Sequence, residues 1–155
     1  GGTVEGHPDG FHEIGFYKLT PSAAGGKLFE AENYFYQWHS EGFTLPHGAE
    51  HLAGSELFPN QAFRIGKTYG MQFHPDVTGE MLYRWSTKAA HRMVLPGAQA
   101  RDRQHAGHAA HNDQIERWSR RFFAHWLAPV RHLVQSPAGA EAFAMASSDQ
   151  GFPAR

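Results

Sequence analysis

The sequence predicts a single domain of the α/β class. The chain has 155 residues, 41% of them hydrophobic, which is long and apolar enough to bury a core. Short runs of aromatic and β-branched residues, bounded by Gly, Pro and Asn, predict strands up to about residue 73. Beyond that point, apolar residues recur at the spacing of an α-helix. Strands followed by helices indicate a sheet flanked by helices.

The expected strands are short and separated by turns. They fall at residues 13–19, 33–39, 50–53, 61–65 and 69–73. The last two should form a hairpin, because only a short turn that begins at Gly66 separates them. The final strand should be buried and should end at His74, since Pro75 cannot donate a hydrogen bond to a neighbouring strand. A single helical turn is expected at residues 28–31.

The first helix is expected directly after the strands. Thr78 is a suitable N-cap for a helix over residues 79–90. This helix carries Met81, Leu82 and Trp85 on one side. We therefore expect that side to face the core.

The second helix is predicted over residues 111–127. Its apolar positions define one face of an α-helix, with polar residues between them. These positions are Ile115, Trp118, Phe122, Phe123, Trp126 and Leu127. We expect a surface helix that packs this face on the core and ends at Pro129. Residues 129–155 are rich in Ala, Gly and Ser and are expected to form a poorly ordered tail.

Composition limits the classes of function. A formal net charge of −1 and a pI near 6.9 argue against binding to nucleic acid. The sequence has no apolar run of membrane-spanning length and no signal peptide pattern, so a soluble, cytoplasmic protein without a membrane partner is expected. It contains no cysteine, which excludes disulfides and thiolate metal sites. It begins Gly-Gly-Thr-Val without Met, which we interpret as a fragment of a longer chain.

His74 and Asp76 form the first candidate functional pair. A histidine at the end of a strand lies at the rim of the sheet, where ligands of open α/β sheets bind. Asp76 is placed to hold one imidazole nitrogen and thereby to fix the tautomer of the ring. The alternative is a surface histidine beside an aspartate that only forms a turn.

Other histidines are open to two interpretations. His39 ends an aromatic strand and is either a packed, hydrogen-bonded core residue or part of a site. His105, His108 and His111 are three residues apart, and at that spacing the outer two do not share one face of a helix. Solvated imidazoles therefore explain these three better than a metal site does.

Several motifs, in order along the chain, resemble class I glutamine amidotransferases. Residues 72–77 (QFHPDV) are similar to the Q-F-H-P-E-V signature of that family. The resemblance covers about residues 1–128 and includes residues 37–41 (QWHSE), 45–49 (LPHGA), 55–56 (SE) and 60–64 (NQAFR). It is greatest for standalone members similar to the amidotransferase domain of GMP synthase. The chain departs from the family twice, because Asp76 replaces the usual Glu and because no cysteine is present to act as the family's nucleophile.

The resemblance implies both an architecture and a place for the chain within it. The implied fold is α/β, a three-layer, flavodoxin-like mixed sheet flanked by helices. Residues 1–128 would be the C-terminal portion of an amidotransferase domain. The N-terminal strands and the segment that carries the nucleophilic cysteine would then be missing.

The resemblance also implies a reaction, in which a Cys-His-acid triad hydrolyses the side-chain amide of glutamine to glutamate and ammonia. His74 would be the base and Asp76 would orient it. The backbone around His39, Ser40 and Glu41 would bind the α-amino and α-carboxylate groups of glutamine. A synthetase domain or subunit would receive the ammonia, and no cofactor or metal is implied.

Two other functions remain open at this stage. One is a γ-glutamyl peptide hydrolase of the same fold, and the other is a non-catalytic binding or regulatory domain. The chain by itself is expected to be inactive in either hydrolysis, because it holds a base without a thiolate nucleophile.

Overall fold

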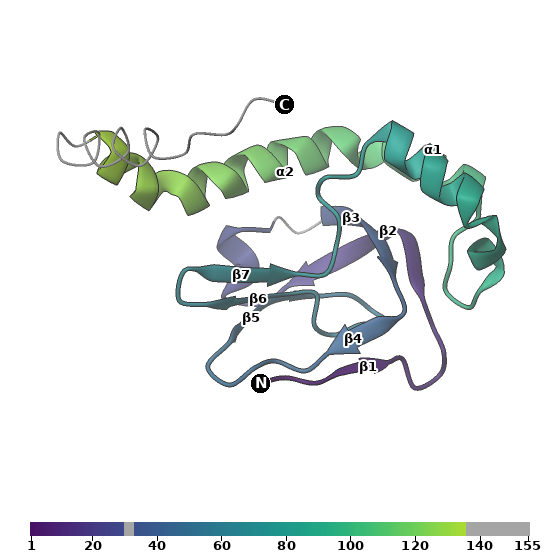
Figure 1. Cartoon of the computed structure of the whole chain (residues 1–155), viewed down its shortest axis with the longest axis horizontal. Helices are drawn as coiled ribbons and strands as arrows, with labels where there is room; N and C mark the ends of the chain where they lie inside the picture. Colours follow the sequence, from purple (N-terminus) through teal and green to yellow (C-terminus); the bar gives the residue numbers. More distant parts are fainter. Residues whose placement is uncertain (30–32, 136–155) are drawn as a thin grey trace, which may run out of the picture. The chain divides into compact units, whose positions relative to one another are not determined.

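A five-stranded antiparallel sheet forms the centre of the domain (Figure 1). The computed structural model describes residues 1–29 and 33–135. In these residues the strand order is β3-β2-β5-β6-β7, and each pair of neighbours is antiparallel. The strands are β2 (Glu13–Pro21), β3 (Asn33–His39), β5 (Glu50–Gly54), β6 (Ala62–Ile65) and β7 (Thr68–Met71). All five predicted strands are therefore present, with β2 longer than expected.

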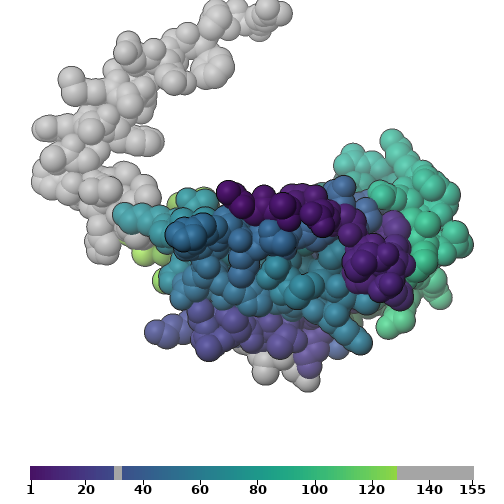
Figure 2. All heavy atoms as spheres, turned by 90° about the horizontal axis from the view of Figure 1, so that it is seen from below, coloured from purple at the N-terminus to yellow at the C-terminus, as the bar shows by residue number. Residues whose placement is uncertain are grey.

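A second, two-stranded sheet pairs β1 (Val4–Gly6) with β4 (Glu41–Phe43). All three residues of β1 are exposed, and the N-terminal residues run across the outer surface in the space-filling view (Figure 2). Because β4 starts directly after the end of β3, this small sheet places its backbone beside the end of the longer strand.

The large sheet curls so that the chain after β7 returns to β3. The backbone N–H of His74 donates to the carbonyl oxygen of Tyr36 at 2.8 Å, which forms an isolated antiparallel bridge. The other edge of β3 is already paired with β2, so His74 closes the free edge. The prediction of a buried strand over residues 69–73 is thus wrong in two respects, the residue at which the strand ends and the burial of its side chains. The strand stops at Met71, and only Phe73 of that segment is buried, because β7 is the outermost strand of the sheet.

The predicted hairpin is confirmed, whereas the helical turn lies elsewhere. Ile65 pairs with Thr68, and Gly66 takes the positive φ of 58° that a tight turn between them needs. The turn expected at residues 28–31 is instead a 3₁₀ turn, η1 (Gly25–Lys27). Residues 30–32 lie outside the described part of the chain.

The first helix follows its prediction closely. Helix α1 (Gly79–Lys88) begins after Thr78, whose hydroxyl oxygen accepts a hydrogen bond from the N–H of Met81 at 3.2 Å. This side-chain cap satisfies one of the backbone donors left free at the start of a helix. A 3₁₀ turn, η2 (Ala90–Val94), follows it.

The second helix, α2 (Arg101–Gln135), is longer than predicted at both ends. Its first turns carry few large apolar residues, so periodicity alone did not indicate them. They are held by tertiary contacts, since buried Gln104 accepts a hydrogen bond from the hydroxyl of Tyr36 at 2.8 Å. The prediction that Pro129 ends the helix is also wrong. A proline removes one backbone hydrogen bond but does not prevent a long helix from continuing. The expected tail from residue 136 lies outside the described residues.

The chain divides into two compact units, of which the first is Gly1–Ser119 and the second begins at Arg120. In the first unit, Trp118 is 1% exposed and packs its ring against Phe29, Phe35 and Phe73 at centroid distances of 5.4, 4.9 and 5.6 Å. This aromatic cluster is the part of the core next to His74. The predicted apolar face of α2 is therefore confirmed at Trp118 and at Ile115, which is also buried.

In the second unit, the predicted apolar face is only partly buried. Phe122 is buried, but Phe123, Trp126 and Leu127 are 47%, 43% and 38% exposed. The rings of Phe122 and Phe123 lie 5.6 Å apart. Periodicity identifies the apolar face of a helix, but it does not reveal whether another part of the chain covers that face. Neither helix of the described residues has an apolar stretch long enough to cross a membrane.

Candidate functional site

His74 is held in place by its backbone and by an aromatic wall. Its N–H bonds to β3, and the preceding side chain, Phe73, is buried in the aromatic cluster. The imidazole meets the indole of Trp85 on α1 edge-on, with 5.2 Å between ring centroids. One third of the side chain remains exposed. His74 is thus fixed from three directions while one side of the ring stays open to solvent.

Asp76 lies beside the ring, as the sequence predicts. The Nδ1 atom of His74 is 3.6 Å from Oδ1 of Asp76, whose side chain is 69% exposed. Burial lowers the pKa of His74 below its ordinary value, and the charge of Asp76 and its hydrogen bond act in the opposite direction. The net result is a histidine that favours its neutral form. A carboxylate at Nδ1 favours the tautomer in which Nε2 is unprotonated and can accept a proton.

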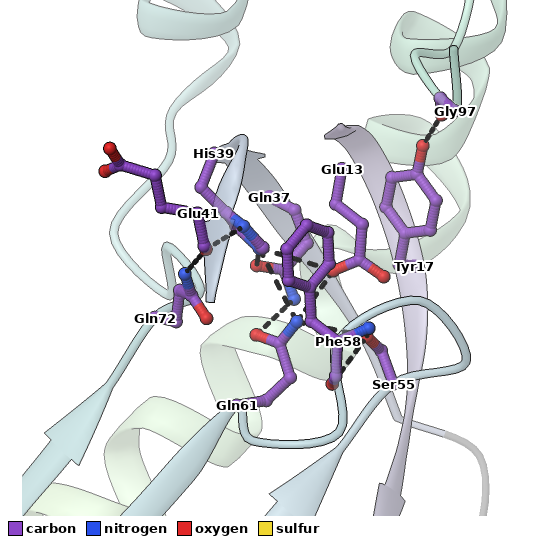
Figure 3. A network of polar contacts seen from close by, with 10 residues as sticks. All are labelled: Glu13, Tyr17, Gln37, His39, Glu41, Ser55, Phe58, Gln61, Gln72 and Gly97. Atoms are coloured by element: carbon purple, nitrogen blue, oxygen red, sulfur yellow. Dashed lines mark hydrogen bonds and ion pairs between the residues drawn. The ribbon is translucent and has the colours of Figure 1, made fainter. Parts of the chain in front are cut away.

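His39 ends β3 with its side chain turned into the protein (Figure 3). The side chain is 11% exposed, and its Nδ1 lies 3.1 Å from the carbonyl oxygen of Glu41. Its Nε2 lies 3.3 Å from Oε2 of Glu13 on β2. The side chain is therefore packed and hydrogen-bonded, which agrees with either of the two interpretations left open by the sequence.

After His39, the carbonyl oxygens of the backbone accept hydrogen bonds from other parts of the chain. The carbonyl oxygen of Ser40 accepts a hydrogen bond from the N–H of His7 at 3.2 Å. The side-chain amide of Gln72 donates to the carbonyl oxygen of Glu41 (Figure 3). The Glu41 side chain itself is exposed. Any role of His39, Ser40 and Glu41 in holding a substrate stays a prediction.

A buried polar network behind His39 was not found from the sequence. Glu13, Gln37 and Gln61 are each 0% exposed and come from β2, from β3 and from the residue before β6. The Gln61 amide nitrogen donates to Glu13 at 2.7 Å and to the Ser55 hydroxyl at 3.1 Å. Gln37, Ser55 and Gln61 each belong to a motif named above, but nothing in the sequence showed that these motifs and Glu13 would meet.

A pocket of about 410 Å³ opens beside the end of β3. His39, Glu41, Phe43, Phe63, Met71 and Gln72 are among the residues that line it. Two of the three predicted substrate-binding residues therefore line one cavity. His74 and Asp76 follow Gln72 in the chain but do not belong to the lining. His39 and His74 are nevertheless close enough for the charge of His39 to be among the causes that lower the pKa of His74.

The three histidines of α2 are not simply solvated, contrary to the prediction. His111 stacks on Tyr34 with 4.4 Å between ring centroids and 7° between the ring planes, and burial lowers its pKa. His108 lies 6.4 Å from the ring of Phe16, and all three side chains are half-buried. His108 and His111 thus lie against rings of the sheet, whereas His105 lies near Tyr83 of α1. No group of three or more metal-binding side chains occurs in the part of the chain that the structure describes.

The fold and the site together define an α/β domain with a histidine–carboxylate pair at the end of a strand. Two solved structures that share this fold are those of glutamine amidotransferases. The crystal structure of one from Methylobacillus flagellatus matches 83% of this chain and 56% of its own, with a TM-score of 0.74 and 23% identity. That of one from Thermotoga maritima matches 82% and 55%, with a TM-score of 0.70 and 22% identity.

A curated relative agrees over a short segment. The GMP synthase [glutamine-hydrolyzing] of Porphyromonas gingivalis is 53% identical over 45 residues, which cover 26% of this chain and 9% of that protein. No protein-family profile matches the chain. The chain therefore spans little more than half of the solved structures that it matches and a small part of the synthase. The chain has the flavodoxin-like α/β fold of these two structures, and one segment of it is similar in sequence to the synthase.

Proposed function

We propose that this chain is the C-terminal portion of a glutaminase domain, which hydrolyses the side-chain amide of glutamine to glutamate and ammonia. His74 is the general base that activates a cysteine, and it later protonates the leaving ammonia. Asp76 orients the ring of His74. The observation that carries the proposal is the 3.6 Å contact of these two side chains at an exposed strand end.

The nucleophile comes from outside the chain, because the sequence contains no cysteine. A thiolate that attacks the amide carbon forms a thioester and releases ammonia, and water then releases glutamate and restores the thiol. His74 is suited to take the thiol proton, since its lowered pKa keeps it neutral near pH 7. The chain alone therefore has no glutaminase activity.

Glutamine lies along the backbone of His39, Ser40 and Glu41, which binds its α-amino and α-carboxylate groups. The pocket beside these residues supports this placement, because it is open and already formed. The ammonia passes to a synthetase domain or subunit, as the glutamine-hydrolysing GMP synthase relative suggests. We place this reaction in the cytoplasm.

The test is a chimera in which the unmatched part of the Methylobacillus flagellatus protein precedes this chain. Ammonia release from glutamine is measured for the chimera, for this chain alone and for variants of the chimera. His74→Ala should lower kcat by about 10²–10⁴-fold, the usual contribution of a general base. Asp76→Asn should lower it by about tenfold, because the carboxylate is exposed and its contact with His74 is long. His91→Ala, an exposed histidine on η2, is the matched control and should have no effect.

Other outcomes would assign the chain differently. Turnover by the chain alone that His74→Ala abolishes would show that the nucleophile lies within these 155 residues. Cleavage of γ-glutamyl peptides but not of glutamine would identify a γ-glutamyl hydrolase. A folded chimera without either activity would favour a non-catalytic domain.

A further inference from the structure

Asp76 interacts only weakly with the imidazole of His74. The 3.6 Å between Nδ1 of His74 and Oδ1 of Asp76 is long for a hydrogen bond, for which about 2.7–3.2 Å is usual. The carboxylate is also 69% exposed, so water screens its attraction for the ring. A general base needs a ring with a fixed direction, because small displacements of a catalytic group slow the reaction greatly. Another side chain is therefore needed to restrain the imidazole.

Trp85 of α1 is in the position to provide this restraint. Its indole lies edge-on to the imidazole of His74, with 5.2 Å between the ring centroids and 75° between the ring planes. Aromatic pairs prefer this geometry. Rotation of the imidazole would either press its atoms into the indole or open a gap beside it, and both are unfavourable in a packed region. A ring contact thus restricts rotation in a way that a screened charge does not.

Trp85 is itself held by the strand that binds the backbone of His74. Its indole packs against Tyr36 and Trp38 of β3, at centroid distances of 6.1 and 5.5 Å. Tyr36 is 0% exposed, and its carbonyl oxygen accepts the hydrogen bond from the N–H of His74. The main chain and the ring of His74 are therefore both positioned relative to β3, the first directly and the second through Trp85.

The direction of the Trp85 side chain follows from the way α1 is anchored. The side-chain cap at Thr78 sets the residue at which the helix begins. Leu82 and Ser86 are both 0% exposed, and they lie three residues before and one residue after Trp85. Residues at this spacing lie on neighbouring parts of one helix face. Burial of Leu82 and Ser86 consequently turns Trp85 toward the sheet.

We propose that Trp85 is the positioning residue of His74 and holds its imidazole in the direction needed to take a proton from the nucleophile. Asp76 then has the smaller role of selecting the tautomer. Trp85 does not belong to the lining of the pocket beside His39, and it acts through His74. Its importance for ammonia release rests on the proposed function, whereas its restraint of the ring does not.

The same contact excludes water from one side of His74. Burial is the largest cause of its lowered pKa, and the indole of Trp85 supplies part of that burial. The nearby charged groups are Asp76, which raises this pKa, and His39 of β3, which lowers it. The charged residues of α1 are exposed and are not among the causes of the shift. They are Glu80, Arg84 and Lys88. Loss of the indole should therefore raise the pKa of His74 toward the ordinary value of about 6.5.

Nuclear magnetic resonance of the chain alone tests whether Trp85 restrains the ring. The ¹³C relaxation of the imidazole reports its motion, and a pH titration of the same signals gives its pKa. His74→Gln assigns the signals among the 12 histidines. Trp85→Ala should make the ring mobile and raise its pKa, whereas Trp85→Phe keeps an aromatic contact and should preserve both properties. Tyr83→Ala removes a 59% exposed ring from the same helix and, as the matched control, should change neither.

Asp76→Asn separates the role of the carboxylate from that of the indole. It should lower the pKa of His74 further, because the charge of Asp76 raises it, but it should leave the ring immobile. The change is made at an exposed side chain, so it tests the proposal even if Trp85→Ala does not fold. A ring that becomes mobile in Asp76→Asn would overturn the proposal. An immobile ring in a folded Trp85→Ala chain would also overturn it.

Kinetics of the chimera described above then test the consequence for the reaction. Trp85→Ala should lower kcat for ammonia release by about 10²-fold, with KM nearly unchanged, because it displaces the base and removes no contact with the substrate. This loss exceeds the loss of about tenfold expected for Asp76→Asn. The acidic limb of the pH profile should move to higher pH, because His74 acts in its neutral form. Trp85→Phe should retain most of kcat.

Two outcomes distinguish this proposal from the proposed function. An active chimera in which Trp85→Ala leaves kcat and the pH profile unchanged would overturn the positioning role of Trp85. A folded chimera that releases no ammonia would contradict the proposed function. A His74 ring that becomes mobile only in Trp85→Ala would still support the restraint by Trp85 in that case.

Discussion

Replacing Trp118 should destabilise the domain more than any change on its surface. The indole is 1% exposed, lies among the rings of Phe29, Phe35 and Phe73, and donates to the carbonyl oxygen of Leu28 at 2.8 Å. Trp118→Ala leaves a cavity among these rings and costs about 3–5 kcal/mol. It also leaves the partly buried carbonyl of Leu28 without its donor, which adds about 1 kcal/mol. Since domains of this size are stable by about 5–15 kcal/mol, the variant should be marginally folded.

The free energy of unfolding is measured by urea denaturation, followed by far-ultraviolet circular dichroism. Trp118→Phe keeps an aromatic ring but removes the N–H group, so it should cost about 1–2 kcal/mol. Trp126→Ala is the matched control, because this tryptophan is 43% exposed, and it should cost less than about 1 kcal/mol. Equal losses for Trp118→Ala and Trp126→Ala would refute the assignment of Trp118 to the core.

Two further predictions concern the helix cap and the dependence on pH. Thr78→Ala removes the side-chain cap of α1 and should lower the free energy of unfolding by about 1 kcal/mol, whereas Thr78→Ser should preserve it. Burial lowers the pKa of both His74 and His111, so the unfolded chain takes up protons there at a higher pH than the folded chain does. Their stabilising contribution is therefore complete above the ordinary histidine pKa of about 6.5 and is lost as the pH falls below it. Urea midpoints at about pH 7.5 and about pH 5.5 should differ less in His74→Gln/His111→Gln than in the unchanged chain.

The sequence predicted correctly those features that depend only on residues close together in the chain. The N-cap at Thr78 and the turn at Gly66 are examples, because a hydroxyl or a missing side chain acts within a few residues. The end of β7 and the start of α2 were missed for the opposite reason. The bridge from His74 to Tyr36 and the contact from Gln104 to Tyr36 join residues far apart in sequence.

The candidate site divides in the same way. His74 and Asp76 are two residues apart, so their contact follows from the motif itself. Glu13 and Gln61 are 48 residues apart, and neither shows by its type that it will be buried. Glutamate and glutamine are usually exposed, so burial of both could be recognised only once the strands were placed side by side.

Because of the bridge between His74 and Tyr36, the structural role of position 74 does not depend on its side chain. The contact uses only main-chain atoms, which every residue except proline can provide at position 74. Evolution can therefore exchange the imidazole for another side chain without opening the curled sheet. An enzyme and a non-catalytic descendant could thus share this scaffold unchanged. What the bridge does not tolerate is a change in chain length between Met71 and His74, which would move the whole segment out of step with β3.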